Sequence, residues 1–267
     1  MRQLQLQTDK MLAHVEDGVG WITFNQPNKR NAVSLVMWQA VPEIIDDFIS
    51  TGDVRVVVLK GAGDKAFVSG ADISEFEEVR NTPEQVVAYE AATGGSHQAL
   101  KSLEIPLIAM IRGFCIGGGM AIALSCDIRI SADDGQFGVP AAKLGLGYGY
   151  GGIKELVNLV GPSFAKEIFF TGGRFSAANA EVMGLVNRVV PVSDLEATVT
   201  TLAKTIADNA PLTVKAAKAA INEGAKDPDQ RELDRIAEMV EVCFNSEDYK
   251  EGRRAFMEKR KPHFQGR

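Results

Sequence analysis

Short apolar runs and segments of helical periodicity alternate along the first two thirds of the chain. The segment MLAHVEDGVGWITFNQ at 11–26 predicts two strands joined by a tight turn at Asp17-Gly18. The run VRVVVLKG at 54–61 is apolar almost throughout, and IPLIAMIRG at 105–113 has the same character. Such runs are typical of strands that are buried on both faces. The pattern therefore predicts a sheet with buried parallel strands.

Helical segments lie between these runs. Ser34 predicts the start of a helix that extends to about Ile49 and carries Trp38 on its apolar face. Pro42 lies inside this segment, and we expect it to kink or shift the helix. Thr82-Pro83 predicts the start of a helix of about twenty residues, because proline is favoured at the first helical position.

The pattern changes near Ser193. Four helical segments follow one another there, at 193–209, 211–225, about 229–245 and 246–260. Strands with interleaved helices followed by an all-helical region predict an α/β core with a helical C-terminal part.

The stretch GFCIGGGMAIALSCD at 113–127 places three glycines between a predicted strand and a predicted helix. A phosphate-binding P-loop needs a Lys-Ser/Thr pair after its glycines, and a dinucleotide-binding turn needs G-x-G-x-x-G; neither occurs here. An oxyanion hole, in which backbone N–H groups hold a developing negative charge, remains as a functional explanation. AFVSGADISEF at 66–76 offers a second N–H donor. Tight turns with positive φ remain the structural alternative for both stretches.

Composition narrows the function classes. The chain has 267 residues, 45% of them hydrophobic and 24% charged, and a formal net charge of −6, which argues against nucleic-acid binding. Cys115, Cys126 and Cys243 form no CxxC pair and are interpreted as reduced structural thiols. The three histidines have no ligand spacing, so we expect no metal. No apolar stretch has the length of a membrane span, and we expect a cytoplasmic protein.

Four stretches together resemble the enoyl-CoA hydratase/isomerase, or crotonase, superfamily. They are NQPNKRNAVS (25–34), AFVSGADI (66–73), PLIAMIRGFCIGGGMAIALSCD (106–127) and EGRRAFMEKRKPHF (251–264). The resemblance implies a spiral of ββα units over residues 1–195 and an all-helical region over 196–267 that packs a trimer, often doubled to a hexamer. It also implies an acyl-CoA substrate and no separate cofactor. The thioester oxygen would be held by the N–H groups of Ala71 and Gly118, and the reaction would pass through an enolate.

The acid–base groups that the resemblance implies are absent. Hydratases of the superfamily carry two glutamates, and the matching positions here are Ala121 and Ala141; an aspartate of related isomerases would fall at Gly149. The chain is thus similar to enoyl-CoA hydratases and isomerases without the hydratase pair. Two alternatives remain: a malonyl-type acyl-CoA decarboxylase, in which Tyr148 matches a tyrosine of that group, and a non-catalytic protein that binds CoA esters. The ring of Tyr148 could also simply pack over the acyl chain.

Binding residues are carried over by the same resemblance. Lys29 and Arg30 follow the first strand pair, and the backbone from Ala66 to Ile73 is expected to line the adenine pocket. Asp72 is expected to hold the turn. Phe256 and Lys259 match positions that reach the CoA of a neighbouring subunit. Glu75 is interpreted as part of a solvated acidic loop, and His97 as a surface or core histidine rather than a catalytic one.

Overall fold

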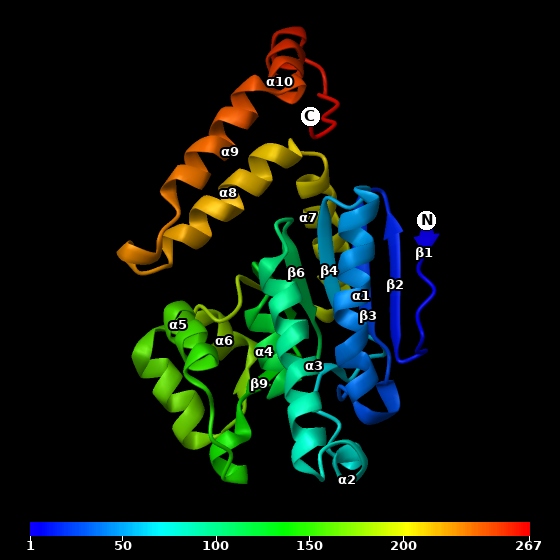
Figure 1. Cartoon of the computed structure of the whole chain (residues 1–267), viewed down its shortest axis with the longest axis vertical. Coiled ribbons are helices and arrows are strands. Elements are labelled where there is room, and N and C mark those ends of the chain that lie inside the picture. Colours follow the sequence, from blue (N-terminus) through cyan, green and yellow to red (C-terminus); the bar gives the residue numbers. More distant parts are fainter.

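The computed structural model describes residues 1–267 as strands and helices that alternate up to about residue 190 (Figure 1). The strands are β1 (Arg2–Gln3), β2 (Met11–Glu16), β3 (Val19–Phe24), β4 (Val56–Gly61), β5 (Ala66–Val68), β6 (Leu107–Ile111), β7 (Phe114–Ile116), β8 (Ile128–Ala132), β9 (Gln136–Gly138), β10 (Phe175–Ser176) and β11 (Arg188–Val190). The helices are α1 (Leu35–Thr51), α2 (Phe76–Val79), α3 (Pro83–Ser102), α4 (Gly118–Leu124), α5 (Tyr150–Thr171), α6 (Ala177–Val182), α7 (Leu195–Ala207), α8 (Pro211–Gly224), α9 (Leu233–Asn245) and α10 (Glu247–Glu258).

The strands form two sheets in a repeating order. The larger sheet has the order β1-β2-β3-β4-β6-β8-β11, and the smaller one has the order β10-β9-β7-β5. The pairs β4/β5, β6/β7 and β8/β9 each contribute one strand to each sheet, and helices follow each pair. Strands β3, β4, β6, β8 and β11 run parallel, as the continuous apolar runs predict. This repetition confirms the expected spiral of ββα units.

The hairpin and the long third helix also follow the predictions. β2 and β3 pair antiparallel, and both residues of the connecting turn, Asp17 and Gly18, have positive φ. Thr82 caps α3 with a full capping box, in which Gln85 returns a hydrogen bond to the backbone of Thr82.

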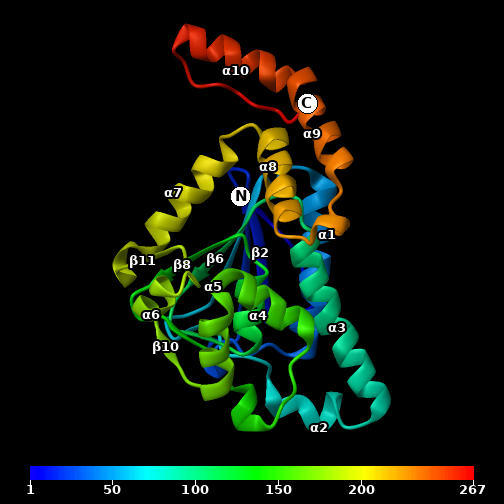
Figure 2. The same ribbon diagram turned by 90° about the vertical axis from the view of Figure 1, so that its left-hand side faces the viewer.

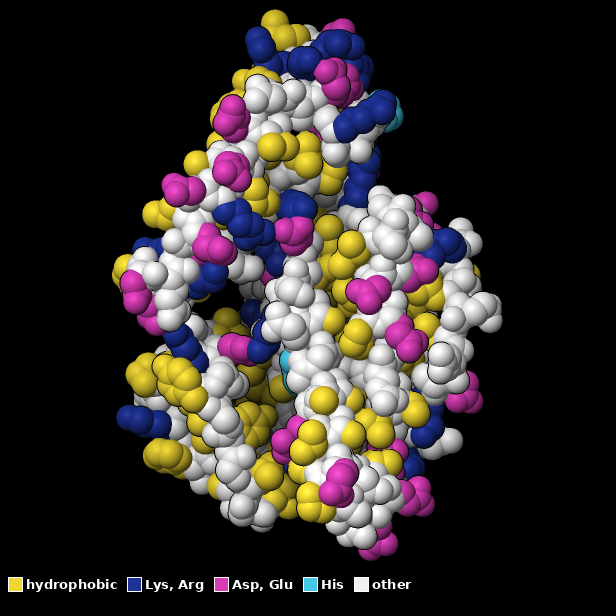
Figure 3. Space-filling view, viewed as in Figure 1, with side chains coloured by type: hydrophobic (Ala, Val, Ile, Leu, Met, Phe, Trp, Pro, Cys, Tyr) yellow, Lys and Arg dark blue, Asp and Glu magenta, His cyan; other side chains and the backbone are white.

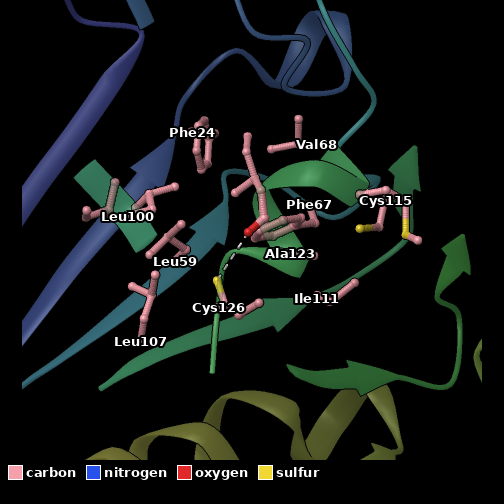
Figure 4. Packing of buried hydrophobic residues seen from close by; sticks show 14 of the residues in the cluster. Phe24, Leu59, Phe67, Val68, Leu100, Leu107, Ile111, Cys115, Ala123 and Cys126 are labelled. Atoms are coloured by element: carbon pink, nitrogen blue, oxygen red, sulfur yellow. Dashed lines mark hydrogen bonds between the residues drawn. The ribbon is translucent and has the colours of Figure 1, made fainter. Parts of the chain in front are cut away.

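Hydrophobic cores lie on both faces of the larger sheet. The main core fills the space between that sheet, α1, α3, α4 and the smaller sheet, and Figure 4 shows Phe24, Leu59, Phe67 and Leu107 packed around Ala123 of α4. Cys126 lies in the same core and donates from Sγ to the carbonyl of Ile122 at 3.4 Å. Burial raises the pKa of the Cys126 thiol to about 12, so this thiol stays protonated.

A smaller core lies on the other face, under α7. Leu195, Val199, Ala203 and Ala207 of α7 are buried against residues of β3, β4, β6 and β8. In Figure 2, α7 runs along this side of the molecule, whereas α8, α9 and α10 lie beyond the end of the sheet. The helix at which the expected C-terminal region begins is therefore packed on the sheet, and the division at residue 195 stays a prediction.

Helix α1 continues without interruption from Leu35 to Thr51 through Pro42, and the expected kink or shift stays a prediction. Proline has no N–H, so the carbonyl of Trp38, four residues earlier, loses its helical partner. The hydroxyl of Ser96, on α3, donates to that carbonyl instead. Ser96 is fully buried, so this bond compensates for the proline inside the packed α1–α3 contact.

The last three helices leave an apolar groove of about 800 Å³. Its lining includes Ala216 of α8, Phe244 of α9, and Phe256 and Met257 of α10. Several of these side chains are largely exposed, with Phe256 at 82% and Met257 at 80%. None of the helices combines the length and hydropathy needed to cross a bilayer.

Candidate active site

The three consecutive glycines between β7 and α4 are glycines for different reasons. Gly117, at the N-cap, has φ of +54°, a conformation that side chains rarely adopt. A Cβ atom on Gly119 would lie 2.1 Å from the carbonyl oxygen of Val68, so close packing against β5 excludes any side chain. Gly118 has neither constraint. Its φ is not positive, and a Cβ there would make only ordinary contacts of 3.5 Å or more.

Gly118 lies close to the backbone nitrogen of Ala71. A Cβ on Gly118 would lie 3.6 Å from the nitrogen of Ala71 and 3.5 Å from Cζ2 of Trp38. Gly118 is the first residue of α4, so its own N–H has no acceptor within the helix. The structure therefore brings Ala71 and Gly118 together, as the sequence predicts.

The N–H of Ala71 is also left without a protein acceptor. Val33 bridges this segment by donating to the carbonyl of Gly70 at 2.8 Å and by accepting from the N–H of Asp72 at 2.9 Å. In such a parallel bridge the N–H of the middle residue, Ala71, points to the opposite side. Gly70, with φ of +119°, makes the turn that directs the N–H of Ala71 away from Val33.

Asp72 holds this turn in place. Its carboxylate is 4% exposed and accepts hydrogen bonds from Lys29 at 2.8 Å, from Gln26 at 3.1 Å and from the hydroxyl of Ser74 at 2.6 Å. Burial alone would raise the pKa of Asp72, but these hydrogen bonds outweigh it and keep the pKa below its ordinary value. Lys29 is thus bound to Asp72, and Ile73 beside it is 73% exposed.

Glu75 is bound to the start of α1 rather than directed into solvent. Its carboxylate accepts a hydrogen bond from the N–H of Leu35, the first residue of α1, at 2.5 Å. The interpretation of Glu75 as part of a solvated acidic loop is therefore wrong. Ser34 begins α1 as predicted, but its buried hydroxyl makes no hydrogen bond, and Glu75 supplies the cap from a distant loop.

Trp38 forms a buried wall beside Gly118. Its Nε1 donates to the hydroxyl of Tyr89 at 3.3 Å, and its ring lies 5.4 Å from the ring of His97. Burial, followed by the positive charge of Lys101, lowers the pKa of His97 to about 4, so this imidazole is neutral at neutral pH. Nδ1 of His97 lies 3.4 Å from the hydroxyl of Ser125, near the end of α4. The sequence pattern predicts Trp38 as a core position, and no motif in the sequence points to Tyr89.

Of the two alanines at the positions where the resemblance implies glutamates, Ala121 lies on α4 shortly after the glycines, and Ala141 follows β9. Ala121 is in the first turn of α4 and is partly exposed, whereas Ala141 is 5% exposed. Tyr148 is partly buried, and its ring packs edge-on against Phe169 with centroids 5.0 Å apart. No protein group accepts from or donates to its hydroxyl, and burial raises its pKa. Figure 3 shows a hollow with hydrophobic side chains between α5 and α3.

A second, polar hollow of about 420 Å³ lies at the other end of β5. It is lined by Pro27, Asn28, Arg30, Ala62, Asp64, Lys65 and Ala66. The guanidinium of Arg30 stacks over the ring of Phe114 at 4.9 Å from the centroid. Two of the residues expected to contact CoA, Arg30 and Ala66, thus line the same hollow. A third, Lys29, is instead bound to Asp72.

Phe256 and Lys259 lie far from these residues within the same chain. Both belong to the end of α10, at the opposite end of the molecule from α2 and α3 (Figure 1). Lys259 is exposed and forms the left-handed C-cap of α10. The structure does not bring these two residues to the Ala71–Gly118 site of their own chain.

The two interleaved sheets with their ββα repetition define a mixed α/β protein of the crotonase fold. The family model for enoyl-CoA hydratase/isomerase matches residues 14–267. The chain therefore belongs to the enoyl-CoA hydratase/isomerase family. It is 38% identical to the short-chain-enoyl-CoA hydratase of Clostridium acetobutylicum, over 96% of this chain and 97% of that protein.

Other relatives extend this similarity. The chain is 34% identical to the crotonyl-CoA hydratase of Syntrophomonas wolfei, over 96% of this chain and 98% of that protein. Among solved structures, an enoyl-CoA hydratase/carnithine racemase from Magnetospirillum magneticum superposes with a TM-score of 0.89 and 36% identity, covering 99% of this chain and 97% of that one. The enoyl-CoA hydratase from Bacillus anthracis gives a TM-score of 0.87 and 33% identity, over 97% and 100% of the two chains.

Proposed function

We propose that this protein is an enzyme that acts on an acyl-CoA thioester and stabilises its enolate between the backbone N–H groups of Ala71 and Gly118. The observation that carries the proposal is the glycine at 118. Neither backbone conformation nor packing requires a glycine there, yet a Cβ at this position would lie only 3.6 Å from the nitrogen of Ala71. Two fixed donors aimed at one point can hold a thioester oxygen as it becomes an oxyanion, and each such donor is worth about 3 kcal/mol in a reaction barrier.

The CoA part of the substrate would bind along β5. The polar hollow at Arg30 and Lys65 offers cations for its phosphates, and it lies at the opposite end of this strand from Ala71. An extended pantetheine arm would then run beside β5 and bring the thioester to the two N–H groups. Phe256 and Lys259 would contribute from a neighbouring copy in a trimer or hexamer, because they cannot reach the site of their own chain.

The alanines at 121 and 141 restrict the reaction. Hydration of an enoyl thioester needs groups that activate water and deliver a proton, and these two positions carry neither. The oxyanion hole serves any reaction that passes through an enolate, including isomerisation. The relatives with printed hydratase names therefore support the substrate class more strongly than they support hydration by this chain.

Decarboxylation of a malonyl-type thioester is a second candidate. Loss of carbon dioxide breaks the bond between C2 and the carboxylate carbon, and the electron pair passes into the enolate, so no general base is needed. The observation that favours this reaction is Tyr148, whose hydroxyl has no protein partner and could orient the carboxylate. A purely CoA-binding role fits less well, since an unused site would tolerate a side chain at position 118.

The test is a screen of enoyl-, malonyl-type and 3-hydroxyacyl-CoA esters with the purified full chain, read by mass spectrometry. A gain equal to one water identifies hydration, and a loss equal to one carbon dioxide identifies decarboxylation. An unchanged mass is followed by chromatographic separation of positional isomers. Binding without turnover of any ester would refute the catalytic proposal, and absence of binding would also refute the CoA site.

A further inference from the structure

The indole edge of Trp38 links the Gly118 junction to a tyrosine hydroxyl that the proposed enolate chemistry does not use. Cζ2 of Trp38 lies 3.5 Å from the position of a Cβ on Gly118. Nε1, on the same edge of the indole, donates to the hydroxyl of Tyr89 at 3.3 Å. Tyr89 belongs to α3 and is 4% exposed. A buried hydroxyl therefore lies one indole edge away from the proposed oxyanion hole.

This hydroxyl has one hydrogen that no protein group accepts. A tyrosine hydroxyl donates one hydrogen bond and accepts others, and an indole N–H can only donate. The bond with Trp38 therefore uses the acceptor side of Tyr89, and the structure contains no acceptor for its own proton. A buried donor without a partner costs about 1–3 kcal/mol. Such a donor is explained if a bound ligand supplies the acceptor.

The ring of Tyr89 is held firmly enough to aim that donor. Phe76 packs edge-on against it with centroids 5.6 Å apart, and the guanidinium of Arg80 lies 5.3 Å from the ring centroid. Burial raises the pKa of Tyr89, whereas the hydrogen bond from Trp38 and the positive charge of Arg80 lower it. The negative charge of Glu75 acts more strongly than the positive charge of Arg80, and Asp72 adds to it, so the pKa is raised on balance. The hydroxyl therefore stays protonated, and the two carboxylates nearby favour an uncharged acceptor over an anionic one.

We infer that Tyr89 is a specificity-determining residue that donates its hydrogen bond to an uncharged oxygen on C3 of the acyl chain, a hydroxyl or a keto group. The inference rests on the proposed function, because it takes the thioester oxygen to be held at Gly118. From that oxygen, C3 is the second chain atom beyond the carbonyl carbon. An acyl chain that follows the edge of Trp38 carries a C3 oxygen toward Tyr89, whereas an acyl chain without that oxygen leaves the buried proton unpaired.

The test compares four esters: butyryl-, 3-hydroxybutyryl-, acetoacetyl- and malonyl-CoA. Their dissociation constants are measured by equilibrium dialysis, with mass-spectrometric quantification of the ester and of any product, for the wild type and for Tyr89→Phe. Tyr249→Phe is the matched control, since Tyr249 lies on α10, away from Trp38, and no protein group accepts the hydrogen of its hydroxyl either. Circular dichroism checks that Tyr89→Phe, which keeps the ring, retains the fold.

The quantity that decides is the ratio of the affinity for each oxygenated ester to the affinity for butyryl-CoA. We expect Tyr89→Phe to lower this ratio about tenfold for the hydroxy and keto esters, the range for one buried hydrogen bond, and to leave it unchanged for malonyl-CoA. Tyr249→Phe should leave all ratios unchanged. Equal loss for all four esters, an unchanged ratio, or a loss confined to malonyl-CoA would overturn the role of Tyr89. Absence of binding by the wild type would refute the proposed function itself.

Discussion

The substitution Gly118→Ala separates the catalytic from the structural explanation of the glycine at 118. The new methyl group would lie 3.5 Å from Cζ2 of Trp38 and 3.6 Å from the nitrogen of Ala71, both ordinary contact distances. The fold should therefore accept it, and alanine is a better helix former than glycine by up to about 1 kcal/mol. The same methyl group would lie 3.6 Å from the nitrogen of Ala71 and would crowd an oxygen bound between the N–H groups of residues 71 and 118.

We expect Gly118→Ala to raise the barrier of the reaction by about 3 kcal/mol, which is roughly a hundredfold in kcat, because the oxyanion can no longer reach both donors. The preferred ester from the substrate screen serves as substrate, and turnover is followed by mass spectrometry. Thermal unfolding is measured in parallel. The melting temperature of Gly118→Ala should equal or exceed that of the wild type.

Two further glycines calibrate this experiment. Gly94 lies in the exposed part of α3, where a Cβ meets nothing within 4 Å, so Gly94→Ala should keep both fold and activity. Gly119→Ala would place its methyl 2.1 Å from the carbonyl oxygen of Val68 and should unfold or strongly destabilise the protein. If Gly118→Ala turned over the substrate as fast as Gly94→Ala, the assignment of the oxyanion hole to Gly118 would be refuted.

The remaining predictions concern chemistry, assembly and stability. The wild type should hydrate crotonyl-CoA far more slowly than a relative with both glutamates, because each absent acid–base group is worth about 10²–10⁴-fold; a comparable rate in a spectrophotometric assay would contradict the positions of Ala121 and Ala141. Tyr148→Phe should lower kcat on the preferred ester at least about tenfold without changing the melting temperature, since its hydroxyl has no protein partner; an unchanged kcat identifies packing. Lys259→Ala should weaken CoA binding by about 1–2 kcal/mol in calorimetry, and light scattering should give the mass of a trimer or hexamer; a monomeric mass or an unchanged affinity rejects the contribution from a neighbouring copy. Asp72→Asn should cost about 2 kcal/mol at neutral pH, and the difference from the wild type should shrink as the pH falls below about 4 through the depressed pKa of Asp72, because that stabilisation needs the ionised form; a difference that does not depend on pH would assign the cost to packing.

Local signals predicted most elements of the fold because short-range chemistry determines them. The turn at Asp17-Gly18, the cap at Thr82 and the buried run at 54–61 each lie within one continuous stretch, and the structure has each of them. The continuity of α1 through Pro42 has no local signal, because it depends on a residue 54 positions away. Ser96 replaces the hydrogen bond that the proline removes, and only the packing of α3 on α1 reveals it.

The sequence predicted the part of the candidate site that consists of backbone N–H groups. Glycine patterns marked the two stretches and the family resemblance pointed to Ala71 and Gly118, yet spacing alone favoured tight turns as the explanation of both stretches. The structure distinguishes the three glycines by what surrounds each one, and the carbonyl oxygen that excludes a side chain at Gly119 comes from Val68, on another strand. The cap that Glu75 provides for α1 escaped prediction for the same reason, since its acceptor and donor are 40 residues apart.

If the proposed function holds, the side chains around the site assign its specificity to α1 and α3 rather than to α4. Helix α4 carries Ala121 at the position that matches a glutamate of the hydratases. It would therefore contribute a backbone N–H group but no acid–base side chain. The polar groups next to the junction come instead from Trp38 on α1 and from Tyr89 on α3. The Ser96 bond that compensates for Pro42 also fixes the backbone of Trp38. A change in the α1–α3 contact would therefore move the indole wall and the tyrosine hydroxyl together while the two N–H groups stay in place. Under the proposed function, substrate preference and enolate stabilisation would be carried by separate elements of one site, and substitutions in the two should have independent effects on affinity ratios and on kcat.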